Sequence, residues 1–329
     1  MKPELIDFVE KFKGKRILII GDMIADIYLK GDISRISREA PVLVLIESEE
    51  KTVAGGAANV VNNVATLGGK AFAVGILGED KGALNLKQIL EENNVNTEGM
   101  FCDKNRKTIT KTRVIAGGRA TVSQQVVRID RECNEVISEI YEKELMNYIK
   151  MVMPQMQGVV MSDYGSGTIT PKIRDLILSL SKEYDIPSII DSRYAIFNFV
   201  GTDYVKQNDA ELASAVGYKI DNEDSLYKAA QEFLVKMQAK GILVTRGEKG
   251  MTLFEANGDV HNIPVSDKSE VFDVSGAGDT CVATFITALA TGAMPSQAAE
   301  LSNFASGIAV RKMGTATVSD EELIAVLKK

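Results

Sequence analysis

Short apolar segments alternate with amphipathic segments along most of the chain. The apolar segments, each flanked by polar or turn-forming residues, predict buried strands at residues 16–21, 71–75, 158–161, 187–191, 203–206 and 242–245. Between them apolar side chains recur every three or four positions, which predicts helices at residues 57–67, 84–93, 143–153, 171–184 and 225–239. Strands that alternate with helices favour an α/β fold with a mostly parallel sheet covered on both faces.

Two stretches interrupt this alternation. Residues 27–48 and 97–130 are rich in β-forming residues and show no helical pattern. They predict antiparallel strands that project from the main sheet as a small β lid, with a tip at residues 116–120. No internal repeat or long linker divides the chain, so we expect residues 1–329 to form a single domain. The last third of the chain predicts helices at residues 278–291, 296–311 and 320–327.

Composition and charge argue against several classes of protein to which this chain could belong. Lys and Arg number 38 and Asp and Glu number 45, and the resulting net charge of −7 argues against a partner that is nucleic acid or an anionic membrane. No apolar segment is long enough to span a bilayer, and the first residues lack the apolar core of a signal peptide. The three cysteines are widely spaced and form no metal-binding motif, which favours a reduced, cytoplasmic location.

The single histidine, His261, lies in a segment of alternating polar and apolar residues that is typical of a strand. A histidine-based metal site or a Ser-His-Asp triad would depend on this residue alone. We therefore interpret His261 as a partly exposed strand residue rather than a catalytic one.

The segment with the clearest chemical signal is residues 271–280, which precede an apolar helix. Gly276, Ala277 and Gly278 are small, so backbone N–H groups at the helix start are free to face a phosphate. Asp279 lies in the first helical turn and is placed to accept a proton from an attacking hydroxyl. The alternative is an ordinary capped turn. A dinucleotide fingerprint fits poorly because Cys281 replaces the third glycine, and the chain contains no P-loop sequence.

A second group of polar and small residues predicts a site for sugar hydroxyls. Gly55 and Gly56 let a ligand approach the backbone, and Asn59 offers both a donor and an acceptor. Asp22 and Asp26 follow the first strand, at the end where open α/β sheets bind ligands. The alternatives are close helix–strand packing with a buried Asn59, and two aspartates of an ordinary turn.

These motifs occur in an order that resembles the ribokinase (PfkB) family of carbohydrate kinases over nearly the whole chain. The resemblance rests on Gly55-Gly56 with Asn59, Asn208 with Glu211, residues 245–250 (TRGEKG) and residues 273–279 (DVSGAGD). Within the family the chain is most similar to the heptose 7-phosphate kinases. This similarity rests on residues 21–26, 34–41, 110–113, 128–130, 162–165 and 314–319.

The resemblance implies a ribokinase-like three-layer α/β/α core with a small antiparallel β lid, and transfer of the γ-phosphoryl group of ATP to a sugar hydroxyl. It implies that Asp279 is the general base and that Gly276, Ala277 and Gly278 form an anion hole. Glu211, with Asn208, would organise Mg²⁺ through water. The remaining implied ligands are Thr245, Gly247, Gly250 and Asn303 for ATP, and Asp273, Ser275 and Gly314 for a monovalent cation such as K⁺.

On the sugar side the resemblance implies Asp22, Asp26, Gly55, Gly56 and Asn59, with Arg35 and Glu39 reaching in from the lid. Three cations on lid strands, Lys111, Arg113 and Arg128, fit a sugar that already carries a phosphate. The alternative is a set of exposed strand charges that pair with Asp130 or Glu132. The chain departs from the heptose kinases at Asp191-Ser-Arg193, where they commonly have Asp-Pro-Lys.

We therefore expect a stand-alone kinase that acts on a sugar or sugar phosphate, because the sequence contains no adenylyltransferase half. The exposed edges of lid strands favour a homodimer in which two lids pair. Three other functions remain open: a kinase for a neutral sugar such as ribose or fructose, a non-catalytic sugar or nucleotide sensor of the same fold, and a Rossmann-type dehydrogenase.

Overall fold

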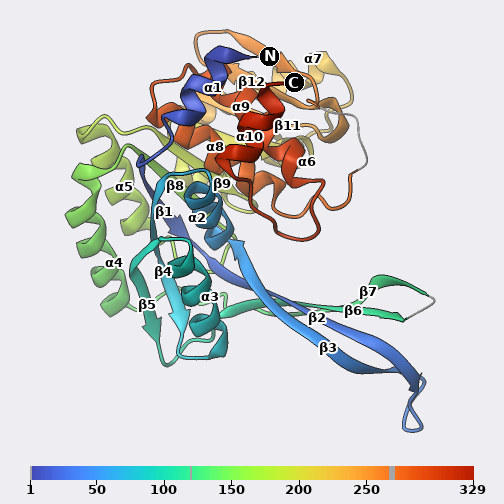
Figure 1. Cartoon of the computed structure of the whole chain (residues 1–329). Helices are drawn as coiled ribbons and strands as arrows, with labels where there is room; N and C mark the ends of the chain where they lie inside the picture. The colour runs from blue at the N-terminus through green and yellow to red at the C-terminus, as the bar shows by residue number, and fades with distance from the viewer. Residues whose placement is uncertain (1, 119–120, 267–270) are drawn as a thin grey trace.

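A central sheet organises the computed structural model, which describes residues 2–118, 121–266 and 271–329 (Figure 1). Within these ranges the sheet has nine strands in the order β13-β12-β11-β10-β9-β8-β1-β4-β5. The pairs from β11 to β5 are parallel, and β12 and β13 add an antiparallel edge. The strands are β1 (Arg16–Gly21), β4 (Lys70–Gly78), β5 (Asn96–Asp103), β8 (Gly158–Asp163), β9 (Ser188–Ser192), β10 (Tyr204–Asn208), β11 (Gly241–Thr245), β12 (Met251–Glu255) and β13 (Val260–Ile263).

Alternating side chains of the central strands divide the core into two layers. In β1, Ile17 and Ile19 pack into one cluster, and Leu18 and Ile20 pack into the other. The first cluster includes α1 (Pro3–Glu10), α2 (Ala57–Thr66), α3 (Lys81–Glu92), α8 (Ala277–Ala290), α9 (Pro295–Ala309) and α10 (Asp320–Leu327). The second includes α4 (Glu139–Val152), α5 (Pro171–Glu183), α6 (Asp209–Val216) and α7 (Glu223–Met237). Short 3-10 turns cover Met153–Gln155, Ile196–Phe199 and Gly247–Lys249.

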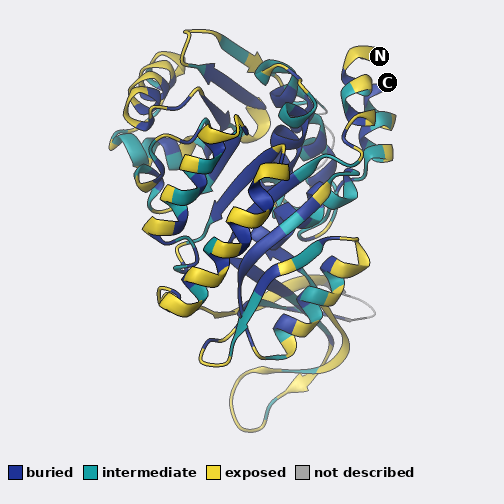
Figure 2. Cartoon of the chain, turned by 90° about the vertical axis from the view of Figure 1, so that its left-hand side faces the viewer, coloured by how far each residue is buried: buried dark blue, intermediate teal, exposed yellow. Residues whose placement is uncertain are grey.

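Burial follows this three-layer arrangement. The central strands of the main sheet are buried and the helices expose their outer sides, whereas the lid is exposed at residues 32–36, 46–51 and 123–131 (Figure 2). The predicted α/β class is confirmed, and so are the strands and helices that the hydrophobic pattern predicted. Among the described residues, no helix combines the length and the apolar character needed to cross a membrane.

The lid is a separate sheet of four described strands in the order β3-β2-β6-β7. They are β2 (Met23–Ile36), β3 (Leu43–Gly56), β6 (Ile109–Gly118) and β7 (Thr121–Arg131). Two antiparallel hairpins, β2–β3 and β6–β7, are joined by a parallel pairing of β2 with β6. Figure 1 shows the lid extending away from the core. The predicted tip at 116–120 includes residues 119 and 120, which lie outside the described residues.

Three details differ from the prediction. Residues 97–103 were wrongly assigned to the lid, because β5 follows α3 as a crossover and pairs in parallel with β4 at the edge of the main sheet. The lid strands β2 and β3 continue further toward the core, to Met23 and Gly56. No residue range was predicted for the eight-residue helices α1 and α6.

Candidate active site

A cavity of about 560 Å³ opens where the carboxyl ends of four parallel strands meet the N-terminus of α8. Asp163, Asp191, Asn208 and Thr245 contribute from the ends of β8, β9, β10 and β11. Open α/β sheets form ligand sites at this edge because the strand ends leave side chains and loops facing one space. The predicted residues that line the cavity are Asn208, Glu211, Thr245, Gly247, Gly250, Ser275, Gly276, Ala277, Gly278, Asp279 and Asn303.

The start of α8 presents backbone amides to this cavity. Gly276 precedes the helix with a φ of 79°, a left-handed conformation that favours glycine. The N–H of Ala277 donates to the carbonyl of Val274 at 3.3 Å. The N–H groups of Gly276 and Gly278 have no acceptor within the described residues. The helix dipole adds positive potential at this point, so the turn suits an anionic group.

Asp279 lies in the first turn of α8 and is buried. Its Oδ2 accepts a hydrogen bond from Asn59 Nδ2 at 2.8 Å, and its Oδ1 accepts one from the Tyr164 hydroxyl at 3.1 Å. Burial raises the pKa of Asp279 to about 6, although the hydrogen bond from Asn59 opposes the rise. A carboxylate with this pKa is ionised at neutral pH and is suited to accept a proton.

Lys206 of β10 is a charged residue of the site that the sequence did not reveal. Its Nζ lies 3.0 Å from Asp191 Oδ2 and 3.9 Å from Glu211 Oε2. Burial opposes the charge on this lysine, but the two carboxylates outweigh burial and raise the pKa of Lys206. A Cβ at Gly278 would lie 2.9 Å from Lys206 Nζ, so the glycine lets the ammonium group approach the helix start.

Asn208 and Glu211 form the capping box of α6. Asn208 Oδ1 accepts from the Glu211 N–H at 2.7 Å, and Glu211 Oε2 accepts from the Asn208 N–H at 2.8 Å. Glu211 Oε1 lies 3.9 Å from Arg193 Nε. Glu211 and Asp191 each keep an oxygen that accepts no hydrogen bond from the described residues. Such oxygens are the ligands that Mg²⁺ prefers, directly or through water, so the residues present fit this ion.

The residues predicted to bind ATP also line the cavity. Thr245 ends β11, and Gly247 and Gly250 border the turn that follows. A Cβ at Gly250 would lie 2.1 Å from the carbonyl oxygen of Ile263, so close packing alone requires glycine there. Asn303 of α9 donates to the carbonyl of Pro264 at 2.8 Å.

Two carboxylates beyond the end of β1 each have a buried oxygen that accepts no hydrogen bond from the described residues. Asp22 Oδ2 accepts from the backbone N–H groups of Tyr164 at 2.8 Å and Ser166 at 3.1 Å. Asp22 Oδ1 and Asp26 Oδ1 accept no hydrogen bond from the described residues. Arg113 Nη1 lies 3.2 Å from Asp26 Oδ1, within ion-pair distance but without hydrogen-bond geometry. Each of these oxygens can therefore accept a further hydrogen bond.

The glycine pair and Asn59 have partners inside the protein. A Cβ at Gly55 would lie 2.7 Å from Asp26 Cγ, so the glycine makes room for this carboxylate. Gly56 has a φ of 54° and packs against Ile24. Asn59 donates to Asp279, and its Oδ1 accepts from Asn63 at 3.2 Å. The structure therefore places Asn59 against the Asp279 carboxylate.

The three predicted lid cations have different surroundings. Arg128 donates two hydrogen bonds to Asp130, at 2.7 and 2.6 Å. Arg113 is paired with Asp26, and its guanidinium carbon lies 5.2 Å from the centre of the Tyr28 ring. Lys111 has no carboxylate within ion-pair distance in the described part of the chain. Burial lowers the pKa of Lys111 below its ordinary value, which indicates a cation that lacks compensation.

Arg35 and Glu39 do not reach the site of their own chain. Both are exposed near the tip of the β2–β3 hairpin, where Arg35 pairs with Val44. Arg35 is nine residues beyond Asp26 along the hairpin, a distance of about 30 Å at the rise of an extended strand. The expectation that these side chains reach inward is therefore not met within one chain.

Asp273, Ser275 and Gly314 lie together. Asp273 Oδ1 accepts from the Ser275 N–H at 2.9 Å, and Oδ2 accepts from the Gly314 N–H at 3.0 Å. Burial favours the neutral acid, but these hydrogen bonds outweigh it and lower the pKa of Asp273. The carboxylate thus connects the loop before α8 to the loop that precedes α10.

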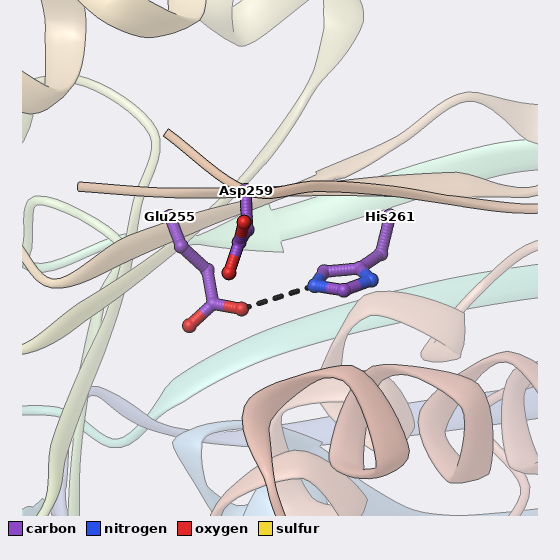
Figure 3. Close-up of side chains that lie close together, drawn as sticks. All are labelled: Glu255, Asp259 and His261. Atoms are coloured by element: carbon purple, nitrogen blue, oxygen red, sulfur yellow. Dashed lines mark hydrogen bonds and ion pairs between the residues drawn. The ribbon is translucent and has the colours of Figure 1, made fainter. Parts of the chain in front are cut away.

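Glu255, Asp259 and His261 form a separate cluster on the β12–β13 hairpin (Figure 3). His261 Nε2 and Glu255 Oε1 lie 3.2 Å apart, and Asp259 accepts a hydrogen bond from Asn257 at 2.8 Å. None of the three lines the cavity. Because each has a partner in the hairpin, we assign the cluster to hairpin stability, which agrees with the interpretation of His261 as a partly exposed strand residue.

Known sequences are similar to this chain over nearly its whole length. A sequence model of the pfkB family of carbohydrate kinases matches residues 15–322. Bifunctional protein HldE of Citrifermentans bemidjiense is 37% identical over 323 residues, which cover 98% of this chain and 65% of that protein. HldE of Desulfatibacillum aliphaticivorans is 38% identical over 321 residues, which cover 97% of this chain and 64% of that protein. The chain spans just under two thirds of the length of these relatives.

Solved structures share the fold at low sequence identity. Ribokinase of Arabidopsis thaliana, complexed with ribose and ATP, has a TM-score of 0.74 at 19% identity and covers 96% of this chain and 99% of its own. Phosphofructokinase-2 of Escherichia coli, in complex with potassium, has a TM-score of 0.74 at 20% identity and covers 96% and 98%. The fold is therefore ribokinase-like.

The first prediction concerns the cost of burying the Asp279 charge. An acid whose pKa is higher in the folded protein than in the unfolded chain begins to destabilise the fold once the pH exceeds the unfolded value, and does so fully above the folded value. The shift from 3.8 to about 6 corresponds to about 3 kcal/mol, because one pKa unit is about 1.4 kcal/mol. Asp279→Asn should therefore raise the free energy of unfolding by about this amount at pH 7.5.

Urea unfolding from pH 4 to pH 8 measures this effect. The gain of Asp279→Asn should shrink as the pH falls from 6 toward 4, because the wild-type carboxyl then becomes neutral in the folded protein. Asp175→Asn, at an exposed position of α5, serves as the control and should change stability little at any pH. A variant that is less stable than the wild type at pH 7.5 would contradict the description of Asp279 as a buried charge.

Proposed function

This chain belongs to the pfkB family of carbohydrate kinases, and from that premise we propose that it transfers the γ-phosphoryl group of ATP to a hydroxyl of a heptose phosphate. D-glycero-D-manno-heptose 7-phosphate is the substrate that fits best. The motif resemblance to heptose 7-phosphate kinases and the relatives named HldE support this choice.

One observation carries the proposal. Asp279 is a buried, ionised carboxylate at the start of α8, beside backbone N–H groups that have no acceptor among the described residues. A carboxylate next to an anion site does not itself bind the anion. The pair suits a reaction in which a hydroxyl loses a proton while it attacks a phosphoryl group.

The chemistry follows from the groups around this point. Asp279 accepts the proton of the sugar hydroxyl while the hydroxyl oxygen attacks the γ-phosphorus of ATP. The bond between the γ-phosphorus and the oxygen that joins it to the β-phosphate breaks, and ADP leaves. The N–H groups of Gly276 and Gly278, together with Lys206, neutralise the charge that develops on the transferred group. Bound Mg²⁺ would neutralise and orient the phosphates of ATP, and Glu211 and Asp191 are the residues that would hold it.

The sugar lies, in this proposal, between the core and the lid. Asp22 Oδ1 and Asp26 Oδ1, which accept no hydrogen bond from the described residues, accept hydrogen bonds from sugar hydroxyls. Lys111 and Arg128 bind the phosphate that the sugar already carries, because neither is committed to a buried carboxylate. The roles of Gly55, Gly56 and Asn59 here are indirect. The glycines make room for Asp26 and Ile24, and Asn59 donates to Asp279.

The nucleotide and a monovalent cation occupy the other side. Thr245, Gly247, Gly250 and Asn303 line the cavity end that we assign to the nucleoside of ATP. Asp273, Ser275 and Gly314 are the residues that we assign to K⁺, which would connect the two loops beside the anion hole. Their backbone and carboxylate oxygens suit a hard cation.

We also propose that two chains pair through their lids. Exposed apolar side chains gather on the lid strands, namely Ile33, Ile36, Val42, Leu43, Ile46, Val126, Val127 and Ile129. An apolar surface of this kind favours an interaction partner, and a second copy offers a matching sheet. Since the hairpin tip lies far from its own site, Arg35 and Glu39 would act on the partner's site.

The second prediction tests the base. Asp279→Asn should lower kcat by a factor of about 10²–10⁴, because the attacking hydroxyl loses its proton acceptor. The dissociation constant of ATP, measured by calorimetry, should change by less than about threefold, since Asn keeps the size of the side chain. Asp175→Asn is the control and should retain wild-type kcat. A variant that keeps more than a tenth of the wild-type kcat would show that Asp279 is not the base.

The third prediction tests the nature of the substrate. Lys111→Met should raise the KM for a heptose phosphate by about tenfold to a hundredfold, because a phosphate loses a charged hydrogen-bond donor. Lys51→Met changes an exposed lysine of the same lid sheet and should leave KM unchanged. Kinetics with phosphorylated and free sugars measure both variants. A wild-type enzyme that prefers free ribose or fructose and ignores Lys111→Met would favour a neutral-sugar kinase.

The fourth prediction tests the lid pairing. Light scattering of the wild type should give twice the 35.7 kDa mass of one chain. Ile46→Glu places a charge on the apolar lid surface, at a residue that is 62% exposed, and should produce a monomer. Val235→Glu, at an 81% exposed residue of α7, is the control and should remain dimeric. A wild type that is monomeric at micromolar concentration would refute the pairing.

A further inference from the structure

Tyr164 connects the two carboxylates of the site. Its backbone N–H donates to Asp22 Oδ2 at 2.8 Å, and its hydroxyl donates to Asp279 Oδ1 at 3.1 Å. Among the described residues, no other residue hydrogen-bonds to both side chains. Tyr164, which directly follows β8, therefore fixes the position of Asp22, the proposed sugar ligand, relative to Asp279, the proposed base.

Two cations hold the ring of Tyr164. Lys111 Nζ lies over the ring at 4.9 Å from its centre, and Arg193 Cζ lies over it at 5.7 Å. Lys111 belongs to β6 of the lid, whereas Arg193 follows β9 of the core. Cations are attracted to the face of an aromatic ring, and more strongly where water is excluded. The ring is therefore the contact through which a lid cation meets the catalytic region.

The hydroxyl of Tyr164 remains a donor over the pH range in which enzymes work. Enclosure in the protein and the Asp279 carboxylate raise the pKa of Tyr164 well above its ordinary value. The phenol thus keeps its proton while Asp279 accepts one from the substrate. With Asn59 donating to Oδ2 and Tyr164 to Oδ1, each carboxylate oxygen has one donor, and the plane of the group is fixed.

We propose that Tyr164 is a positioning residue, which keeps the Asp279 carboxylate oriented and ionised while Lys111 of the lid keeps the phenol ring in place. This inference rests on the proposed role of Asp279 as base. It gives Lys111 a second task beside phosphate binding, because its Nζ lies over the Tyr164 ring.

A role in packing alone predicts a different pH dependence. A hydrogen bond donated to a carboxylate favours its ionised form, so loss of the Tyr164 hydroxyl should move the ionisation of Asp279 to higher pH. The other charged groups that face Asp279 are Asp191 of β9 and Lys206 of β10. Both are unchanged when only the hydroxyl is removed, so a shift of the acidic limb reports on Tyr164 itself.

The fifth prediction uses Tyr164→Phe, which keeps the ring and removes the hydroxyl. We expect kcat to fall about tenfold or more, and the acidic limb of the kcat/KM profile to move to higher pH, with the KM for ATP unchanged. The matched control is Tyr141→Phe. It removes a hydroxyl that donates to the Cys102 carbonyl at 2.8 Å outside the cavity, and it should leave kcat and the pH profile unchanged.

A second variant separates the ring from the hydroxyl. Tyr164→Leu removes both, so it should show the defect of Tyr164→Phe and also raise the KM for the phosphosugar, because Lys111 loses its aromatic contact. Thermal melting of each variant checks that the fold is retained. Tyr164→Phe alone decides the question if the leucine variant does not fold.

The outcomes separate this inference from the proposed function. Wild-type kcat and an unmoved acidic limb in Tyr164→Phe, with Asp279→Asn inactive, would overturn the positioning role alone. A loss of kcat without a shift of the limb would also overturn it, because it would indicate packing only. An active Asp279→Asn would overturn the base itself, whatever Tyr164→Phe shows.

Discussion

A negative charge held away from water is the constraint on which this site depends. Asp279 is buried, and an isolated carboxylate is unfavourable in such a position. Its compensation comes from Asn59 of α2, Tyr164 after β8 and Lys206 of β10. These elements lie far apart in the sequence, so the main sheet has to form before the carboxylate can be ionised at its position. The folded core is therefore needed to bring together the groups that keep Asp279 charged.

The charges of the cavity explain why a divalent cation belongs in the proposed reaction. Among the described residues, five carboxylates and three cations line it: Asp163, Asp191, Glu211, Glu248 and Asp279, with Arg193, Lys206 and Arg311. Lys206 is already shared between Asp191 and Glu211. A triphosphate that enters this excess of negative charge needs further compensation. Glu211 and Asp191 are the carboxylates that would hold Mg²⁺, and the bound ion would supply positive charge that offsets their repulsion of the phosphates.

Local patterns in the sequence predicted local structure, and the site depends on contacts between distant segments. The glycine turn before Asp279 was recognisable because helix starts and free amides are local features. The partner of Asp279, Asn59, lies 220 positions away and was interpreted as a sugar ligand. Asn208 and Glu211 read as a metal motif but also cap α6. Lys206 was hidden because it interrupts an apolar strand, and only the tertiary structure shows the carboxylates that keep it charged.

The lid cations differ in how readily they can exchange a carboxylate for a substrate phosphate. The Arg113–Asp26 pair is buried, with 14% and 4% of the side chains exposed, and breaking it would leave an uncompensated charge. The Arg128–Asp130 pair is 44% and 27% exposed, and such pairs contribute about 0–1 kcal/mol. A phosphate can therefore displace Asp130 from Arg128 at little cost and use the same two N–H groups. Arg128 and Lys111, rather than Arg113, are the cations through which the lid would distinguish a phosphorylated sugar from a neutral one.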